Sequence, residues 1–492
     1  MKQITLLLLT LLFSFSLNAQ TDKDIVLQTV NKATIESHIY FLADDLLKGR
    51  ETGTPECEIA ASYLANAFRR YGVKPNPKTG NYYQEVKLKK TVPPTQVSIE
   101  INGEAISNYA IISATNIDSN EDIIYLGYGL ETDYANKNVK GKIVIIKGGS
   151  TEAKDVRTAF GLRNKKQQLA KDNGVIGLIE LLNAPERSWR FIERNFNTSK
   201  LSVAEINNEN TNSEFAYIWL LDKDNALASI LSHLKTISAK ISLNKNDDEF
   251  ISSNNVIGIV EGTDPKLKNE YIIYSAHYDH VGIGTADKTG DTIYNGARDN
   301  AVGTTTVLSM AENLAKNPTK RSALFILFTA EEKGLLGSKY YVENPVLPLQ
   351  QMVYCFNSDN AGYNDTSLAT IVGLTRTTAA QNIKDAAAAF GLTAVDDPAP
   401  EQGLFDRSDN VHFARKGIPA PTFSLGFTAF NGDVTKYYHR PGDEANTLDY
   451  DYLLKFFQAY VLSGRKIAND SKTPVWTTGD KYEEVGKSLY KN

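Results

Sequence analysis

The second half of the chain alternates apolar runs with segments of helical spacing, and this alternation limits the fold more than any other feature of the sequence. The apolar runs are Val256 to Val260, Tyr271 to Ala276, Ala323 to Thr329, Met352 to Phe356 and Ala369 to Val372. Helical patterns lie at residues 300–317, 335–343, 378–390 and 450–469. Continuous apolar runs are typical of strands buried on both faces. We therefore expect an α/β fold with a mostly parallel sheet and helices on both faces.

The first half of the chain has a different texture. Apolar side chains at helical spacing predict one helix from Thr34 to Lys48 and another over about Glu58 to Tyr71, with Gly72 as the stop signal of the second. Beyond residue 90, short apolar runs separated by turn residues predict a separate β-rich domain with one helix near residues 163–172. The polar run at residues 244–255 is interpreted as the linker that ends this domain.

The first 19 residues have the pattern of a secretory signal peptide. Lys2 is followed by an apolar stretch from Ile4 to Leu17 and by a small-residue cleavage site that ends at Ala19. An uncleaved membrane anchor is the alternative, but about 14 apolar residues are fewer than the roughly 20 that a spanning helix needs. We expect cleavage near Ala19 and export to the periplasm or to the outside, with no membrane span in the mature chain.

Composition narrows the chemistry. The 53 Lys and Arg and 58 Asp and Glu form no long run of one sign, so the sequence has no electrostatic pattern for binding nucleic acid. Two cysteines cannot build a disulfide framework or a thiolate zinc cluster, and Cys57 and Cys355 are expected to be buried and unpaired, although the sequence does not decide whether they pair. Any metal would have to be held by carboxylates and by some of the six histidines.

Reactive side chains follow the predicted strands, at the sheet edge where α/β proteins bind ligands. The strings are AHYDHVG, RDNAVG, TAEEKGLLGS and NSDNAG, together with YYHRPGDE at residues 437–444. They supply the candidates His277, Asp279, His280, Asp299, Glu331, Glu332, Asp359 and His439. The histidines outside these strings, at positions 38, 233 and 412, are expected to be ordinary surface or hydrogen-bonded residues.

Histidines and carboxylates without thiolates form a ligand set suited to zinc or a similar divalent ion. Five or six ligands exceed what one tetrahedral ion uses, whereas two ions bridged by a carboxylate, roughly 3.5–4 Å apart, accommodate them. Because neighbouring residues at a strand end point in different directions, one of Glu331 and Glu332 can bind metal while the other holds a water. A helix-capping role is the alternative for this pair. A glycosidase is disfavoured, because its two carboxylates flank a bond at least ~5 Å apart.

These strings resemble the di-zinc exopeptidases of the bacterial leucyl aminopeptidase type, metallopeptidase family M28. AHYDHVG, GARDNAVGT, TAEEKGLLGS, NSDNAG and YHRPGD occur in the family's order within about residues 251–470, and LADDLLKGRETGT resembles the family's opening segment. The resemblance implies the zinc exopeptidase fold, with a peptidase domain at 20–90 and 251–475 and a C-terminal tail at 476–492. Residues 91–250, with LGYGLETDY, VKGKIVIIKGG and NGVIGLIEL, resemble a protease-associated domain inserted into it.

The resemblance also implies a role for each site residue. His277 and Asp359 would hold one zinc ion, Glu332 and His439 the other, and Asp299 would bridge the two. Glu331 would be the general base, and Asp279 would accept the second imidazole proton of His277. The hydroxyl of Tyr438 would polarise the substrate carbonyl. Asp409 would be part of the substrate pocket. The family commonly has an apolar residue on each side of the carboxylate at position 359. Here these neighbours are Ser358 and Asn360, so the sequence does not predict how the residues around Asp359 pack.

The implied reaction is hydrolysis of the first peptide bond of a peptide with a free amino terminus by an aminopeptidase with two zinc ions. Three alternatives stay open. One is a carboxypeptidase or dipeptidase, in which Arg298, Arg407 or Arg440 would bind a substrate carboxylate. Another is a single-zinc acyltransferase of the glutaminyl cyclase kind, and the third is a non-catalytic binding protein, against which the complete ligand set argues. The sequence predicts neither the preferred amino-terminal residue, nor the oligomeric state, nor the role of the insertion.

Overall fold

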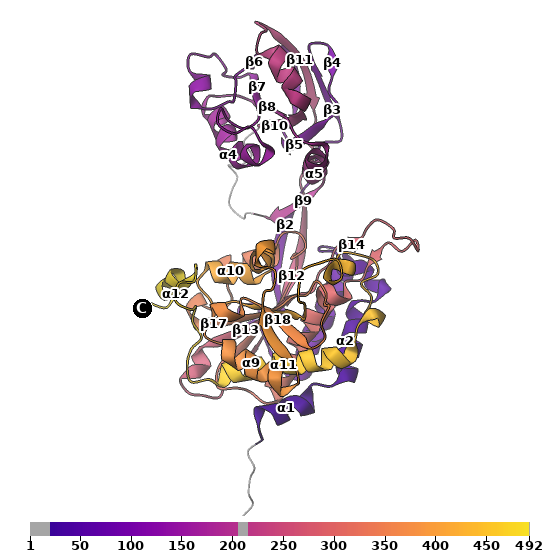
Figure 1. The fold of residues 1–492 in the computed structure, drawn as a ribbon, viewed down its shortest axis with the longest axis vertical. Helices are drawn as coiled ribbons and strands as arrows, with labels where there is room; N and C mark the ends of the chain where they lie inside the picture. The colour runs from indigo at the N-terminus through magenta and orange to yellow at the C-terminus, as the bar shows by residue number, and fades with distance from the viewer. Residues whose placement is uncertain (1–19, 205–214, 492) are drawn as a thin grey trace, which may run out of the picture. The chain divides into compact units, whose positions relative to one another are not determined.

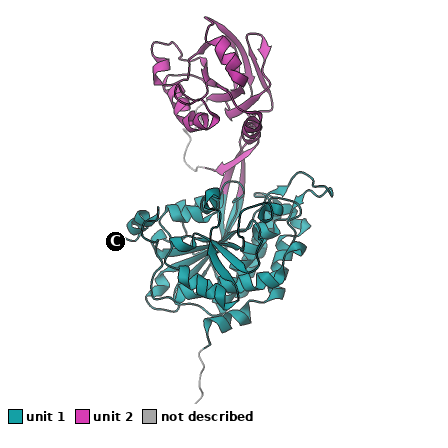
Figure 2. Cartoon of the chain, in the orientation of Figure 1, with its two compact units in different colours: residues 1–86, 253–492 teal, residues 87–252 magenta. Residues whose placement is uncertain are grey.

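The protein is described here by a computed structural model of residues 20–204 and 215–491, so the predicted signal peptide lies outside the described residues. The chain forms two compact units, residues 1–86 with 253–492 and residues 87–252 (Figure 1, Figure 2). The second unit corresponds to the predicted insertion, whose kinship with protease-associated domains stays a prediction. Within the described ranges, no helix has the length and apolar character needed to cross a membrane.

Unit 1 is built around a mixed sheet with a parallel centre. From one edge, the first seven strands are β19 (Thr393–Asp396), β18 (Leu368–Val372), β20 (Thr422–Leu425), β17 (Met352–Ser358), β13 (Tyr271–His277), β16 (Ser322–Phe328) and β12 (Glu249–Val260). β13 pairs in parallel with β16 and β17, and β17 pairs in parallel with β20, whereas β12 and β18 join β16 and β20 antiparallel. The predicted α/β class is confirmed, with antiparallel pairs on either side of the parallel centre.

Helices cover both faces of this sheet. Along β16, Phe325 and Leu327 belong to one apolar core and Leu324 and Ile326 to another, because successive side chains of a strand point to opposite faces. The first core includes residues of α1 (Asp22–Thr29), α2 (Lys32–Leu42), α3 (Pro55–Tyr71), α7 (Gly303–Lys316), α9 (Ala380–Ala389) and α11 (Tyr450–Asn469). The second includes residues of α8 (Leu336–Glu343) and α10 (Asn410–Arg415). The continuous apolar runs of the sequence thus become strands buried from two sides.

The first predicted helix ends earlier than expected. α2 stops at Leu42, and the short helix η1 (Asp45–Arg50) follows it. Lys48, Gly49 and Arg50 have φ angles of 42°, 70° and 48°, which an α-helix cannot contain. The second helix, α3, ends at Gly72 in the left-handed conformation, as predicted.

The linker predicted at residues 244–255 holds only for residues 244–248, because residues from Glu249 onward form the first half of β12. Ser253 and Asn255 in this half are fully buried. The Asn255 amide donates to the side-chain oxygen of Gln84 and to the carbonyl of Gly337, both at 3.0 Å, and the Ser253 hydroxyl lies 2.7 Å from that of Thr329. Polar side chains are tolerated in a buried strand when each has a hydrogen-bond partner.

Unit 2 contains a second sheet with helices of its own. Its strands are β4 (Glu104–Ala105), β3 (Val97–Ile101), β11 (Ile237–Leu243), β6 (Ile117–Tyr125), β7 (Ile143–Lys147), β8 (Gly177–Leu182), β10 (Ala216–Leu221) and β5 (Tyr109–Ser113), in this spatial order. The helices α4 (Val156–Asp172) and α5 (Glu186–Phe196) contribute to one of its two apolar cores. The β-rich texture predicted beyond residue 90 thus corresponds to an eight-stranded sheet.

The two cysteines are free and buried. Cys57 belongs to the first core of unit 1 and Cys355 to the second, so the sheet lies between them. This agrees with the expectation of two unpaired thiols.

The segment after residue 475 is packed against unit 1. Trp476 is buried, and its indole N–H donates to the carbonyl of Gly417 at 2.9 Å. Helix α12 (Glu483–Leu489) follows it. The predicted tail thus contributes to the second core of the unit.

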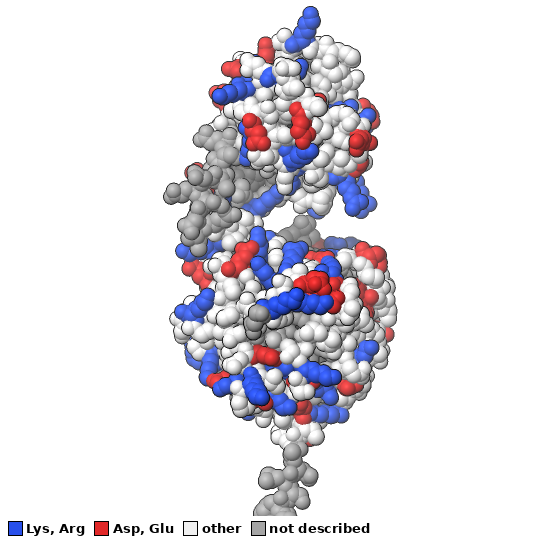
Figure 3. Space-filling view, turned by 90° about the vertical axis from the view of Figure 1, so that its left-hand side faces the viewer, with Lys and Arg blue, Asp and Glu red and all other residues white. Residues whose placement is uncertain are grey.

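Charged side chains of both signs are interspersed on the face shown in Figure 3. Exposed ion pairs among the described residues include Lys32 with Asp451 and Lys165 with Glu131, each at 2.9 Å. Exposed pairs contribute only about 0–1 kcal/mol to stability, so the surface charges explain little of the fold.

A buried ion pair inside unit 2 gives a first prediction. Lys166 and Glu180 are both fully buried, with the Lys166 ammonium 2.6 Å from Glu180 Oε1 and 2.9 Å from the carbonyl of Lys147. Removing one partner of such a pair leaves an uncompensated charge, which lowers stability by roughly 3–5 kcal/mol. We expect Lys166→Met to lower the free energy of unfolding of unit 2 by this amount in denaturant titrations.

The neighbouring exposed pair provides the control for this prediction. Lys165→Met breaks only the pair with Glu131, whose side chain is 60% exposed, and should change the free energy of unfolding by less than about 1 kcal/mol. Equal unfolding midpoints for the Lys165 and Lys166 variants would contradict the buried pairing.

Candidate metal centre

The predicted site residues converge beyond the carboxyl ends of three parallel strands of unit 1. His277 ends β13, Glu331 and Glu332 follow β16, and Asp359 follows β17. Asp299 lies in the helical segment η5 (Ala297–Val302), before α7. Two groups of ligand atoms result, each with all atoms within 4.8 Å of one another: one from His280, Asp299, Glu332 and His439, the other from His277, Glu331 and Asp359.

Asp299 joins the two groups. Its Oδ1 lies 3.2 Å from Nε2 of His277, and its Oδ2 lies 3.2 Å from Nε2 of His439. Nε2 of His277 is also 3.3 Å from Asp359 Oδ1, and Nε2 of His439 is 3.2 Å from Glu332 Oε2. Ligands at about 2.0–2.1 Å from a tetrahedral zinc ion lie about 3.3 Å apart. These separations fit two ions that share Asp299.

The backbone directs the two adjacent glutamates to different groups. Ala330, directly before them, has a φ of 57°, a left-handed conformation that non-glycine residues rarely adopt. After this turn, Glu331 Oε2 lies 4.0 Å from Nε2 of His277, while Glu332 contacts His439. His439 itself has a φ of 50°. Such strain is typical of functional sites that the surrounding structure holds in place.

Asp279 organises the loop that carries the glutamates. Its carboxylate accepts hydrogen bonds from the backbone amides of Glu331 at 3.1 Å and Glu332 at 3.4 Å, and from the hydroxyl of Thr52 at 2.9 Å. His277 Nδ1 lies 3.1 Å from the backbone carbonyl of Asp279 and 3.8 Å from its carboxylate. The hydrogen-bond partner of this imidazole is therefore the carbonyl, and the carboxylate supports Glu331 and Glu332.

The charges of the site call for a bound cation. Burial lowers the pKa of His439, but its contacts with Asp299 and Glu332 raise it to about 10. Burial raises the pKa of Glu331 well above its usual range. Nε2 of His439 and Oε1 of Glu332 are buried without a hydrogen-bond partner among the described residues. Buried carboxylates held this close are stabilised by a metal ion, so the residues fit a divalent ion with nitrogen and oxygen ligands.

Arg298 is occupied by the protein itself. It is buried, and its guanidinium donates to Asp443 Oδ1 at 2.9 Å and to the hydroxyl and carbonyl of Thr447 at 2.7 and 2.8 Å. Asp443 also accepts from the backbone amide of Asp299 at 3.2 Å. Arg298 therefore ties the segment of Asp299 to the loop that carries His439, and it is not available to a substrate carboxylate.

The polar neighbours of Asp359 pack through hydrogen bonds. The Asn360 amide donates to Asn300 Oδ1 at 3.0 Å, and its oxygen accepts from the backbone amide of Leu425 at 2.9 Å. The amide of Asn300 donates to the carbonyl of Ser358 at 2.9 Å. The departure from apolar neighbours at positions 358 and 360 thus comes with a polar network that fixes Asp359.

A pocket opens beside the two groups. Its wall includes four of the carboxylates, Tyr438 and Arg407, and apolar side chains, namely Val372, Leu404, Phe427 and Phe430. The Tyr438 ring stacks on that of His439, with centroids 4.0 Å apart. Asp409 is fully buried directly after the pocket residue Ser408, and burial raises its pKa to about 7. Its role in substrate binding stays a prediction.

Arg50 supports the centre and was not singled out in the sequence. It is buried, and it donates from Nε to the carbonyl of Tyr278 at 2.7 Å and from its terminal nitrogens to the carbonyls of Asn295 at 2.6 Å and Gly296 at 3.0 Å. It thus joins the loop after His277 to the segment before Asp299. Its partners are backbone carbonyls, which leave no pattern in a sequence.

Comparison with known proteins finds a family that resembles this centre. Residues 255–462 match the model of peptidase family M28. The resemblance predicted from the motifs is thereby confirmed.

Individual relatives are aminopeptidases by name. Aminopeptidase YwaD of Bacillus subtilis (strain 168) is 32% identical over 200 residues, which are 39% of this chain and 40% of that protein. Leucine aminopeptidase 2 of Arthroderma otae is 25% identical over 268 residues, 53% of this chain and 46% of that protein. The matched segments therefore span less than half the length of these relatives. The structure of an aminopeptidase from Aneurinibacillus sp. strain AM-1 is similar with a TM-score of 0.58 at 22% identity, covering 92% of this chain and 97% of that one, which shows a common fold.

Proposed function

We propose that the protein is a zinc-dependent aminopeptidase that hydrolyses the first peptide bond of peptides with a free amino terminus. The observation that carries this proposal is the carboxylate of Asp299, whose two oxygens face different histidines at 3.2 Å each. His277 and Asp359 would hold one zinc ion with Asp299, and Glu332 and His439 the other. When bound, two such ions polarise a carbonyl and lower the pKa of a water.

Glu331 would act as the general base. Its side chain lines the pocket, and Asp279 fixes its backbone amide. A buried carboxylate with a raised pKa is suited to take a proton from the attacking water and to return it to the leaving amine. Tyr438 in the same wall would donate its hydroxyl to the substrate carbonyl, and Glu331 and Asp359 would accept the substrate ammonium.

The free amino terminus is the testable part of this proposal. We expect acetylation of an aminoacyl p-nitroanilide to lower kcat/KM by at least roughly 10- to 100-fold, because hydrogen bonds to a charged group contribute about 1.5–3 kcal/mol each. A panel of free and acetylated substrates, assayed with and without chelator, measures this. Equal cleavage of both forms would rule out an aminopeptidase, and cyclisation of amino-terminal glutamine peptides would favour the acyltransferase instead.

The second candidate is a peptidase that binds the carboxylate of its substrate. The position of Arg407 favours this candidate. Arg407 lines the pocket and lies over the ring of Phe430 at 5.7 Å, and within the described residues it has no carboxylate partner. Dipeptides with free and amidated carboxyl ends, added to the same panel, separate the candidates. An aminopeptidase tolerates amidation, whereas a dipeptidase that uses Arg407 loses the charge-assisted pairing.

We also propose that the protein acts outside the cytoplasm and that unit 2 is a protease-associated domain. The signal-peptide pattern that ends at Ala19 supports export. Two buried, free cysteines are compatible with either redox environment. Amino-terminal sequencing of the exported protein should begin at Gln20.

A further inference from the structure

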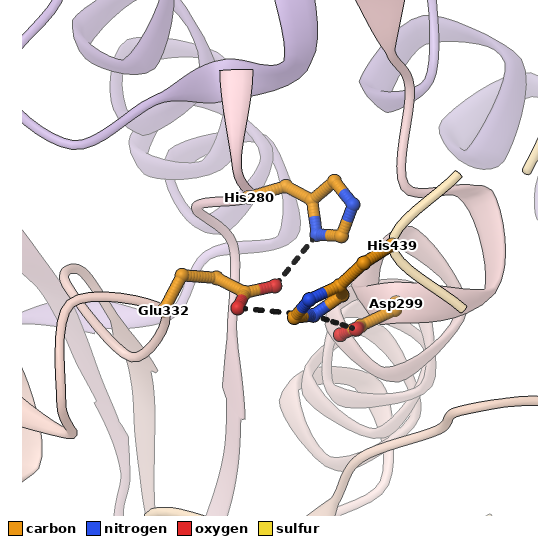
Figure 4. Close-up of side chains that lie close together, drawn as sticks. All are labelled: His280, Asp299, Glu332 and His439. Atoms are coloured by element: carbon orange, nitrogen blue, oxygen red, sulfur yellow. Dashed lines mark ion pairs between the residues drawn. The ribbon is translucent and has the colours of Figure 1, made fainter. Parts of the chain in front are cut away.

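His280 is a third histidine in the centre, and neither the motifs nor the family match gives it a role. Its side chain is fully buried beside Asp299, Glu332 and His439 (Figure 4). His280 Nδ1 lies 2.7 Å from Oε1 of Glu332, whereas Nε2 of His439 lies 3.2 Å from Oε2. The two histidines thus approach opposite oxygens of one carboxylate.

We propose that His280 is a positioning residue, which donates from Nδ1 to Oε1 of Glu332 and thereby keeps Oε2 directed at the second metal position. This inference rests on the proposed metal-binding function of the site. In the structure the N–H of His280 is not aligned with Oε1, and neither ring nitrogen has an aligned hydrogen-bond partner among the described residues. Oε1 of Glu332, at 2.7 Å, is therefore the acceptor within hydrogen-bond distance of Nδ1.

The distances distinguish positioning from direct metal ligation. The 2.7 Å between His280 Nδ1 and Glu332 Oε1 is a hydrogen-bond distance and is shorter than the about 3.3 Å expected between two ligands of one tetrahedral ion. Among the described carboxylates, Glu332 is the one with an oxygen within 4.0 Å of a ring nitrogen of His280. His439, in contrast, contacts both Asp299 and Glu332, as a ligand should.

The surroundings of His280 fix its ring. Its backbone amide donates to the carbonyl of Arg50 at 3.2 Å. Gly296 packs so closely that a Cβ on it would lie 2.6 Å from Cγ of His280. The ring also meets that of His439 edge to face, with centroids 5.5 Å apart. A buried polar group without a hydrogen-bond partner lowers stability by about 1–3 kcal/mol. The burial of the His280 imidazole is therefore best explained by an interaction with the carboxylate of Glu332, which it faces.

The geometry leaves one oxygen of Glu332 for a metal ion, because His280 approaches Oε1 at 2.7 Å whereas Oε2 lies on the side of His439. Hydrogen bonds of this kind, made to a ligand rather than to the metal, typically change metal affinity or activity by 10- to 100-fold.

Metal binding tests the inference. In competition titrations of the full-length protein with a zinc-binding dye, we expect His280→Ala to weaken one of two zinc sites by roughly 10- to 100-fold and to leave the other unchanged. His280→Asn keeps an N–H near the position of Nδ1 and should recover part of the affinity. His233→Ala, at an exposed position in unit 2, is the control and should bind zinc as the wild type does.

Three outcomes would overturn the inference. Unchanged affinity in His280→Ala, with a normal circular dichroism spectrum, would show that His280 does not support Glu332. A change in the visible absorption of the cobalt-substituted His280→Asn variant would show that His280 is itself a ligand. Loss of both metal sites in a folded His280→Asn variant would show a role beyond Glu332. If the wild type binds no metal, the proposed function fails first, so the two failures are distinguishable.

Discussion

Replacing Glu331 with glutamine is expected to lower kcat by about 100- to 10,000-fold, the usual contribution of a positioned general acid–base group. Glutamine keeps the size of the side chain but cannot take a proton from water. Because Glu331 lies 4.0 Å from Nε2 of His277 and is not one of the ligands placed around Asp299, zinc content should stay the same. Steady-state kinetics on an aminoacyl p-nitroanilide and elemental analysis of the purified variant measure both effects.

The adjacent glutamate is the matched control for this experiment. Glu332→Gln removes the carboxylate that contacts His439 at 3.2 Å, so this variant should lose both activity and part of its zinc. Loss of metal from the Glu331 variant, or an active Glu331 variant, would contradict the division of roles between the two residues.

Removal of metal by a chelator is expected to reduce activity by more than about 1,000-fold, because metal ions contribute several kcal/mol to transition-state stabilisation in such reactions. The apoprotein should also unfold at a lower temperature, because its buried carboxylates would repel each other without a cation. Stepwise return of zinc, followed by activity and by thermal unfolding, should show saturation at two equivalents.

The stoichiometry of this titration also tests the alternatives. Full activity with one equivalent of zinc would contradict the two-ion proposal and favour a single-zinc acyltransferase. Full activity in the chelated protein would show that the reaction does not require a metal ion.

Much of the fold could be predicted because apolar runs mark buried strands directly. α11 begins and ends at the predicted residues, since it does not depend on distant partners to reveal its pattern. The first half of β12 was missed because Ser253 and Asn255 look like linker residues until Thr329, Gln84 and Gly337 satisfy them. Such partners are distant in sequence, so local pattern cannot identify them.

The candidate site likewise contains residues that could be predicted from the sequence and residues that could not. His277, Glu332 and Asp359 end or follow strands, and their position in the chain already places them at one edge of the sheet, whereas Asp299 and His439 lie in a helical segment and a loop. Arg50 and Asp443 could not be predicted, because they act on backbone groups of distant loops. The environment of His280 was also hidden, because the contact with Glu332 depends on how two loops meet.

The centre depends on residues near both ends of the chain, and this has a consequence for synthesis. The Arg50 carbonyl holds His280, and Arg298 is fixed by the side chain and carbonyl of Thr447. A ribosome makes the amino-terminal partners long before His439 and Thr447 emerge, and contacts of such high sequence separation form late in folding. A nascent chain therefore cannot complete this centre until translation is nearly finished.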